Sequence, residues 1–209
     1  MNRIDAKGLL LRIFIPTIVL SMSYLILGHF CNIPYILLFC ILGTVILLPM
    51  ELGMIISASK KEYGTYSLKS ALEGQEQLAL WKIVLIAFVF FGIAGLLSAF
   101  VAPIENHIFS VARSNLLSNL PIGFDWTDYE YLKFFSKPII IFTCVYYGIF
   151  NALIAPITEE LFFRGYLTSH YKKQSSFTPI LIAVLFSLYH FWLPFNNVFR
   201  ILALSLIHI

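Results

Sequence analysis

The sequence predicts an all-α protein, a polytopic bundle of transmembrane helices with about six spans in this chain. Of the 209 residues, 59% are hydrophobic and only 12% are charged, and the mean hydropathy is +0.86. A water-soluble domain carries about 25% charged residues, so this composition is typical of a membrane protein. The apolar residues also form runs of about 20, the length that a helix needs to cross a bilayer. Because neither an internal repeat nor a soluble segment stands out, we treat residues 1–209 as a single integral-membrane domain.

Six apolar runs account for the predicted spans. The first follows two basic residues, as a signal peptide would, but it is longer than the apolar core of about 7–15 residues in such a peptide. It also has no small-residue cleavage site, so we expect it to be retained as the first span. The sixth is cut off by the end of the chain. We predict the first three spans over roughly residues 9–30, 33–59 and 83–102. The fourth starts at 138 and continues into the two glutamates at 159 and 160, the fifth covers roughly 177–195, and the sixth starts near 198.

Basic residues gather at the ends of the predicted spans and set the expected orientation. Positive charges flank the start of the first span, follow the second at Lys60 and Lys61, and follow the fourth at Lys172 and Lys173. Since cytoplasmic loops carry an excess of Lys and Arg, we predict that these ends and the N-terminus face the cytoplasm. This distribution of charge gives no reason to propose nucleic-acid binding.

Two adjacent glutamates, Glu159 and Glu160, lie inside the fourth predicted span, and Arg164 follows four residues after the second. A carboxylate at bilayer depth costs roughly 2.5–3.5 kcal/mol, so an acid at this place is a functional hypothesis. A structural ion pair between Glu160 and Arg164 explains one of the two acids, because residues four apart share a helix face. It leaves Glu159 unexplained, since that side chain points about 100° away around the helix.

A histidine, His190, lies about halfway along the fifth predicted span. A lone histidine in a helix is more often a core residue than a catalyst. If the fourth and fifth spans form an antiparallel hairpin that turns at residues 172–177, Glu159 and His190 are each about 15 to 16 residues from its centre. Phe163 and Phe186 fall level by the same arithmetic. The hairpin therefore predicts a carboxylate and an imidazole at the same depth.

Such a pair is suited to acid–base chemistry. A carboxylate away from bulk water is a stronger base and can take a proton from a water molecule, while a histidine can hold that water or stabilise an oxyanion. Glu159 and His190 could also bind Zn²⁺, but they fall short of the three protein ligands of a catalytic zinc site. Arg164 would keep Glu160 ionised and fix that face of the helix.

At these residues the chain resembles a known family. The pattern Glu-Glu-x-x-x-Arg, followed about 30 residues later by Phe-x-x-x-His, resembles the CPBP (Abi) family of intramembrane proteases. That family includes type II CAAX prenyl endopeptidases and bacteriocin-processing or self-immunity proteins. The resemblance implies that Glu159 activates water, that Glu160 and Arg164 support it, and that His190, with Phe186 beside it, acts at the water or the oxyanion. It covers about residues 155–191, within a family-like core at 138–203, and we expect a bacterial plasma membrane.

The chain departs from the family pattern near its end. A later His-x-x-x-Asn or His-x-x-x-Asp motif is missing, because His208 is followed only by Ile209, and we give His208 no catalytic role. Residues 204–209 resemble a translated sequencing adapter. We therefore expect a foreign end on a truncated frame, and a native protein that continues for two or more helices.

Two functions follow as hypotheses. The leading one is an intramembrane endopeptidase that hydrolyses a peptide bond with glutamate-activated water. The alternative is a membrane binding or bacteriocin self-immunity protein that keeps the family fold without turnover. Metal dependence stays open: the family is often labelled metalloprotease, whereas the sparse ligands here suit a metal-free mechanism better. Prenylated CAAX peptides, leader peptides and membrane-protein tails are all candidate substrates.

Two further polar residues are interpreted without catalysis. Glu51 lies late in the second span, about six residues before basic residues of the loop, so we expect its carboxylate to reach the cytoplasmic interface. His170 falls at a predicted helix end and is given no chemical role.

Overall fold

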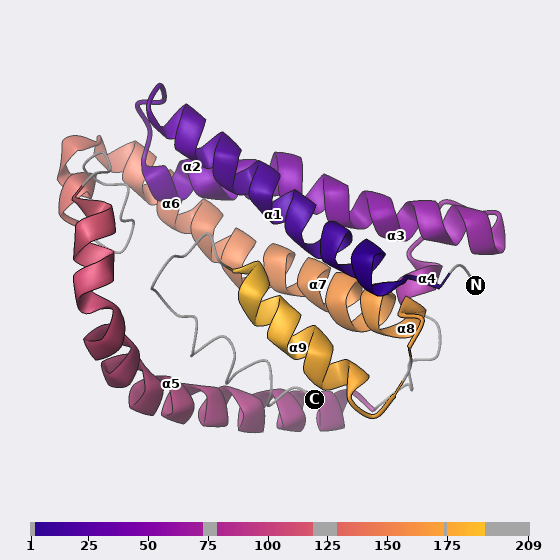
Figure 1. Ribbon diagram of the computed structural model, residues 1–209. Coiled ribbons are helices and arrows are strands. Elements are labelled where there is room, and N and C mark those ends of the chain that lie inside the picture. Colours follow the sequence, from indigo (N-terminus) through magenta and orange to yellow (C-terminus); the bar gives the residue numbers. More distant parts are fainter. Residues whose placement is uncertain (1–2, 73–78, 119–128, 174, 191–209) are drawn as a thin grey trace.

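The computed structural model describes residues 3–72, 79–118, 129–173 and 175–190 of the chain. Within these ranges the structure consists of helices and their connections, and the predicted all-α membrane bundle is confirmed (Figure 1). The predicted sixth span and the suspected foreign end, residues 204–209, lie outside the described residues.

The helices follow one another with short connections. π-helical turns over Gly43–Leu47, Phe150–Ile154 and Glu160–Leu167 join α2 to α3, α6 to α7 and α7 to α8, and a 3₁₀ turn over Tyr129–Phe134 precedes α6. The α-helices are α1 (Ala6–Gly28), α2 (Tyr35–Leu42), α3 (Leu48–Tyr63), α4 (Lys69–Leu72), α5 (Leu80–Leu117), α6 (Lys137–Ile149), α7 (Ala155–Glu159), α8 (Thr168–His170) and α9 (Thr178–Tyr189).

Three helices in the described ranges are long and apolar enough to cross a membrane, namely Ala6–Gly28, Tyr35–Tyr63 and Lys137–His170. They correspond to the predicted first, second and fourth spans. The predicted third span lies within α5, a long curved helix that contains Pro103 (Figure 1). The predicted fifth span begins as α9, which has 12 residues and ends just before His190, where the described part of the chain stops.

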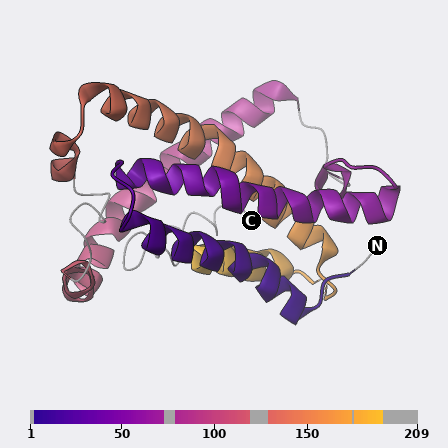
Figure 2. The ribbon, with the colours of Figure 1, turned by 90° about the horizontal axis from the view of Figure 1, so that it is seen from above.

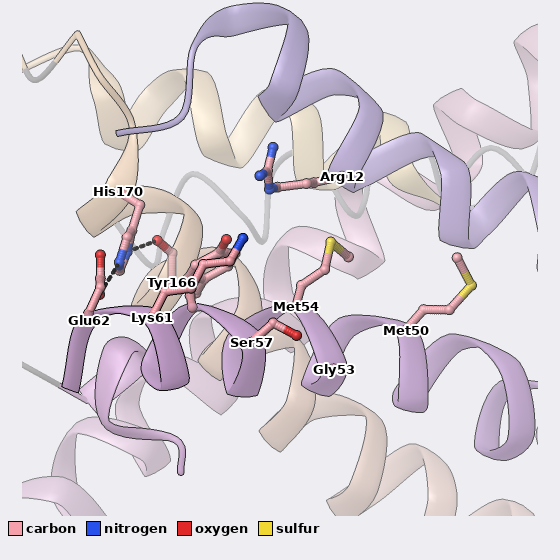
Figure 3. Close-up of a pocket in the computed structure, with 10 residues that line it drawn as sticks. Arg12, Met50, Gly53, Met54, Ser57, Lys61, Glu62, Tyr166 and His170 are labelled. Atoms are coloured by element: carbon pink, nitrogen blue, oxygen red, sulfur yellow. Dashed lines mark hydrogen bonds and ion pairs between the residues drawn. The ribbon is translucent and has the colours of Figure 1, made fainter. Parts of the chain in front are cut away.

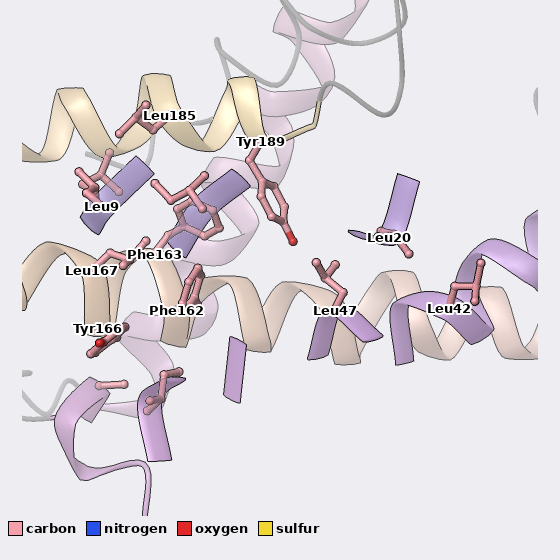
Figure 4. Packing of buried hydrophobic residues seen from close by; sticks show 14 of the residues in the cluster. Leu9, Leu20, Leu42, Leu47, Phe162, Phe163, Tyr166, Leu167, Leu185 and Tyr189 are labelled. Atoms are coloured by element: carbon pink, nitrogen blue, oxygen red, sulfur yellow. The ribbon is translucent and has the colours of Figure 1, made fainter. Parts of the chain in front are cut away.

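The core lies where α1, α3, α9 and the helix from α6 to α8 meet (Figures 1 and 2). Large apolar side chains from all of them fill it, and Figure 4 shows Leu9, Phe163 and Leu185 meeting across the space between α1, α9 and the turn after α7. On the outer side of α1, apolar side chains such as Ile18, Met22 and Ile26 lie exposed. A helix that is apolar on both its packed face and its outer face is suited to the interior of a lipid bilayer.

One end of the bundle brings together the N-terminal segment, the end of α3 and the turn after α8, with their basic residues. The N-terminal segment binds the end of α8, because the Ile4 amide donates to the His170 carbonyl at 2.7 Å and the Lys172 amide donates to the Ile4 carbonyl at 2.8 Å. The helix α3 ends at the same end of the bundle, at Gly64, whose φ of 74° is left-handed and suits glycine. The predicted cytoplasmic ends therefore lie together in space.

Part of the polar stretch after α3 folds back into the core. The short helix α4 packs on Gly165, where an added Cβ would collide with the carbonyl oxygen of Ala71. Ser70 is buried and donates its hydroxyl to the Ile55 carbonyl at 2.9 Å, and it accepts a hydrogen bond from the Ser59 hydroxyl at 2.9 Å. These contacts fix α4 against α3 and against the helix that carries the glutamates.

Candidate active site

Glu159 and His190 come together as the hairpin predicts. Glu159 is the last residue of α7, and His190 directly follows α9, which packs antiparallel to the turn after α7 (Figure 1). The His190 Nε2 atom lies 3.8 Å from Oε1 of Glu159, and the two side chains are 12% and 21% exposed. The predicted closeness of the two groups is confirmed. The separation exceeds a direct hydrogen bond, and a water molecule beside the two atoms could hydrogen-bond to both.

The backbone of α9 orients the His190 ring. Nδ1 of His190 lies 2.9 Å from the carbonyl oxygen of Phe186. Since a carbonyl oxygen can only accept, Nδ1 carries the hydrogen and donates it. In the neutral imidazole, Nε2 is then the nitrogen without a hydrogen, and this is the nitrogen that faces Glu159. Two acceptor atoms therefore face one another across the 3.8 Å separation.

Aromatic side chains hold the histidine in place. The Phe186 ring meets the His190 ring edge to face, with the ring centres 4.8 Å apart. Phe186 also packs edge to face on Phe163 at 4.9 Å, so these two residues lie level as predicted. Phe186 thus contacts His190 through both its carbonyl and its ring, which is the supporting position expected for it.

The predicted Glu160–Arg164 pair forms, but it is not buried. Nη1 of Arg164 donates to Oε1 of Glu160 at 2.6 Å, while the two side chains are 32% and 56% exposed, Arg164 first. The other described helices therefore do not enclose this pair. Consecutive residues of a helix point about 100° apart, so Glu160 is more exposed than the neighbouring Glu159.

A π-helical turn begins directly after Glu159. Over Glu160–Leu167 the helix widens, and the Thr168 amide bonds to the Phe163 carbonyl five residues earlier. The Thr168 hydroxyl donates to the same carbonyl at 2.8 Å, which supports the widened turn. Such turns are rare and occur often at functional sites. No residue pattern in this segment distinguishes a π-helix from an α-helix in advance.

A cavity of about 190 Å³ opens beside Glu159. Its walls come from the turn after α7 and from the first half of α9, and they are mostly apolar, with charged groups at one side. The position next to Glu159 would allow a bound chain to reach the carboxylate. The lining residues are Glu159, Glu160, Phe163, Arg164, Thr168, Pro179, Ile182, Ala183 and Phe186.

Glu51 is a buried residue near the candidate site whose position the sequence did not predict. It is only 1% exposed, and its carboxylate accepts a hydrogen bond of 2.7 Å from the hydroxyl of Tyr189, the residue before His190. The expectation that Glu51 reaches the membrane interface is therefore wrong. Glu51 also lies near enough to Glu159 for their charges to interact. Its place inside an apolar run was the available signal, since the same criterion singled out Glu159.

A second glutamate and histidine meet at the basic end of the bundle, beside a larger cavity of about 330 Å³ (Figure 3). Nε2 of His170 lies 3.0 Å from Oε2 of Glu62, within hydrogen-bond distance, and the two side chains are 3% and 9% exposed. Figure 3 shows this pair at one end of the cavity, with Met50 at the other and Arg12 above. His170 does sit at a helix end as predicted, but it is buried there.

The described residues do not complete a metal site. Within the ranges that the structure describes, no three His, Cys, Asp or Glu side chains gather closely enough to hold a metal ion. Glu159 and His190 supply two ligands, one fewer than the three protein ligands of a catalytic zinc site.

The long apolar helices define a class, an integral membrane protein, and the described residues place a glutamate and a histidine 3.8 Å apart within its helical bundle. Residues 141–208, about a third of the chain, match the family model of type II CAAX prenyl endopeptidase Rce1-like proteins. This part of the chain is therefore similar to the CAAX-type membrane proteases that its two motifs indicated. No curated protein and no solved structure matches the chain.

Proposed function

We propose that the protein is an intramembrane endopeptidase in which Glu159 activates the water that hydrolyses a peptide bond. The observation that carries this proposal is the 3.8 Å separation between Oε1 of Glu159 and Nε2 of His190. With Nδ1 bonded to the Phe186 carbonyl, both facing atoms are acceptors, and a water molecule can donate one hydrogen to each. The family match supports the same reaction class.

The proposed reaction starts from that water. Its two hydrogens are held by Glu159 and His190, so a lone pair of its oxygen is directed at the substrate. The oxygen adds to the carbonyl carbon of the scissile bond while Glu159 takes a proton, and a tetrahedral oxyanion forms. When the C–N bond breaks, Glu159 returns the proton to the leaving amine. One water is consumed, and a carboxyl and an amino group are produced.

The cavity beside Glu159 supports a peptide substrate. Its apolar walls, from Phe163, Ile182 and Phe186, suit an apolar side chain or a lipid group, and the peptide would lie along them toward the carboxylate. Arg164 pairs with Glu160 at the rim. The candidate substrates are prenylated C-terminal peptides, leader peptides and the tails of membrane proteins.

We also propose that the basic end of the bundle faces the cytoplasm of a bacterial cell, with the protein in the plasma membrane. The N-terminal segment, the end of α3 and the turn after α8 carry the basic residues and lie together in space. This arrangement supports one shared cytoplasmic side for all three.

The test is peptide cleavage by the purified protein in liposomes, followed by mass spectrometry. One peptide from each of the three substrate classes is used, in water enriched in ¹⁸O. The wild-type protein is expected to cleave at least one of them and to place ¹⁸O in the new carboxyl group. Glu159→Gln keeps the side-chain shape and removes the base, so cleavage should fall by about 10²–10⁴-fold. Undiminished cleavage by Glu159→Gln would remove the basis of the proposal.

Two further arms separate the alternatives. Full activity in a strong chelator favours water activated by glutamate alone, whereas a loss that Zn²⁺ restores favours a metal bound with Glu159 and His190. If the wild-type protein binds a peptide but cleaves none, the binding or self-immunity role becomes the better one.

A further inference from the structure

The contact between Glu51 and Tyr189 joins two helices that are distant in the sequence. Tyr189 is the last residue of α9, and Glu51 lies in the first turn of α3. The hydroxyl of Tyr189 donates to Oε1 of Glu51 at 2.7 Å, with 0% and 1% of the two residues exposed. An enclosed carboxylate is expensive unless it is hydrogen-bonded, so this bond is a strong constraint on both helices.

Tyr189 is held from two more sides. Its backbone carbonyl accepts a hydrogen bond of 3.0 Å from the hydroxyl of Thr17 in α1, which is fully buried. Its ring packs edge to face on Phe163, with the ring centres 5.0 Å apart. Figure 4 shows the side chain reaching from the end of α9 into the core. Contacts with α1, α3 and the turn after α7 therefore fix the position of this one residue.

His190 depends on Tyr189 for its own position. It lies just past the last helical residue, with φ of −84° and ψ of 22°, and its amide bonds to the Ser187 carbonyl at 3.2 Å. The rings of Tyr189 and His190 meet edge to face at 5.1 Å. A shift of Tyr189 would move the His190 ring with it and change the distance from Nε2 to Glu159.

We propose that Glu51 and Tyr189 form a positioning pair, which sets the place of His190 relative to Glu159 through their hydrogen bond. This inference rests on the proposed function, because the distance matters only if the two groups share a reacting water. Neither residue of the pair needs to touch the substrate. The pair acts because a displacement of about 1 Å in a catalytic group can lower a rate by about 10²-fold.

The test uses variants that separate position from charge and from stability. Tyr189→Phe and Glu51→Leu each remove the bond but leave one enclosed polar group behind, so both can also lower stability. The double variant Glu51→Leu/Tyr189→Phe removes both polar groups and should recover most of the thermal stability. Glu51→Gln keeps an acceptor oxygen for the Tyr189 hydroxyl, removes the charge and replaces the second oxygen with an amide NH2 group. Ser59→Ala is the matched control, because it breaks another buried hydrogen bond of α3, away from the site.

Positioning predicts a specific pattern in the peptide-cleavage assay. The double variant should keep its fold yet show a kcat about 10- to 100-fold below wild type with an unchanged KM. Glu51→Gln should retain most of the wild-type kcat, and Ser59→Ala all of it. A purely structural pair would instead give a stable double variant with wild-type kcat. If Glu51 acted as a base, Glu51→Gln would be as slow as the double variant. Either of those results overturns the proposal.

A second readout does not need cleavage. Diethyl pyrocarbonate acylates the unprotonated imidazole nitrogen, and mass spectrometry gives its rate at His190 relative to the exposed His29 of the same chain. We expect this ratio to differ between the double variant and the wild type, and to be unchanged in Ser59→Ala. If the wild-type protein cleaves none of the peptides, the proposed function fails. The ratio of the acylation rates at His190 and His29 still tests whether the Glu51–Tyr189 pair sets the position of His190. An unchanged ratio in the double variant overturns the positioning role.

Discussion

The described part of the chain contains two glutamate–histidine contacts in which the histidine is held in the same way but lies at a different distance from its glutamate. In each, Nδ1 of the histidine lies 2.9 Å from the carbonyl oxygen of an aromatic residue four positions earlier, Tyr166 for His170 and Phe186 for His190. In each, that aromatic ring also packs on the imidazole, with centres 4.7 Å and 4.8 Å apart.

The two contacts differ in their final distance. Nε2 of His170 bonds directly to Glu62 at 3.0 Å, whereas Nε2 of His190 stops 3.8 Å from Glu159. The first contact is also more enclosed, at 3% and 9% exposed against 12% and 21%. A contact closed by a direct hydrogen bond, as between His170 and Glu62, satisfies both groups and stabilises the fold. An open contact, as between His190 and Glu159, can hold a water molecule and act on it. Residue type alone does not separate the two roles.

The largest expected effect is on the open contact. His190→Ala removes the atom that holds the second hydrogen of the water, so kcat should fall by about 10²–10⁴-fold with little change in thermal stability. Steady-state cleavage kinetics and a melting curve of the same preparation measure the two effects. A kcat near the wild-type value would place His190 outside the reaction.

An intermediate effect is expected at the closed contact between His170 and Glu62, and it falls on stability instead of on the cleavage rate. His170→Ala removes a buried hydrogen bond to Glu62 and should lower the free energy of unfolding by about 1–3 kcal/mol. The folded fraction should cleave at the wild-type rate, because His170 lies at the other end of the α7–α8 segment from Glu159. Melting curves and the cleavage rate per folded molecule check this. A lost rate with unchanged melting would make the closed contact functional.

The smallest effect is expected at the Glu160–Arg164 pair. Since both side chains are partly exposed, Arg164→Ala should lower the free energy of unfolding by only about 1 kcal/mol, and Arg164→Lys by less. Melting curves of the two variants test this. A loss from Arg164→Ala as large as that from His170→Ala would show that the pair is enclosed in the membrane.

The sequence was enough to predict contacts within the hairpin. Glu159 and His190 are equally far from one short turn, so helix geometry alone sets them level, and Phe163 and Phe186 follow by the same reasoning. The Glu160–Arg164 pair is even more local, with partners one turn apart. Its exposure was not predictable, because it depends on which other helices cover that face.

Contacts between distant helices could not be predicted in this way. Glu51 and Tyr189 are 138 residues apart, and no periodicity within one helix indicates which other helix will meet it. Glu51 near basic loop residues resembles a residue at the membrane interface. Only the packing of α3 against α1, α7 and the turn after α7, together with the Tyr189 hydroxyl, encloses it. The folding of α4 onto Gly165 is missed for the same reason, since a polar stretch of 18 residues, 60–77, has the composition of a loop.

The most direct test of the account shortens each glutamate by one methylene and keeps its charge. Glu159→Asp and Glu62→Asp are measured side by side for kcat and for thermal stability. Glu159→Asp should lose about 10²-fold in kcat and keep its stability, because its carboxylate no longer reaches the shared water. Glu62→Asp should lose stability and keep its kcat. A Glu159→Asp protein that cleaves at the wild-type rate would contradict the claim that the 3.8 Å separation between Glu159 and His190 organises the reaction.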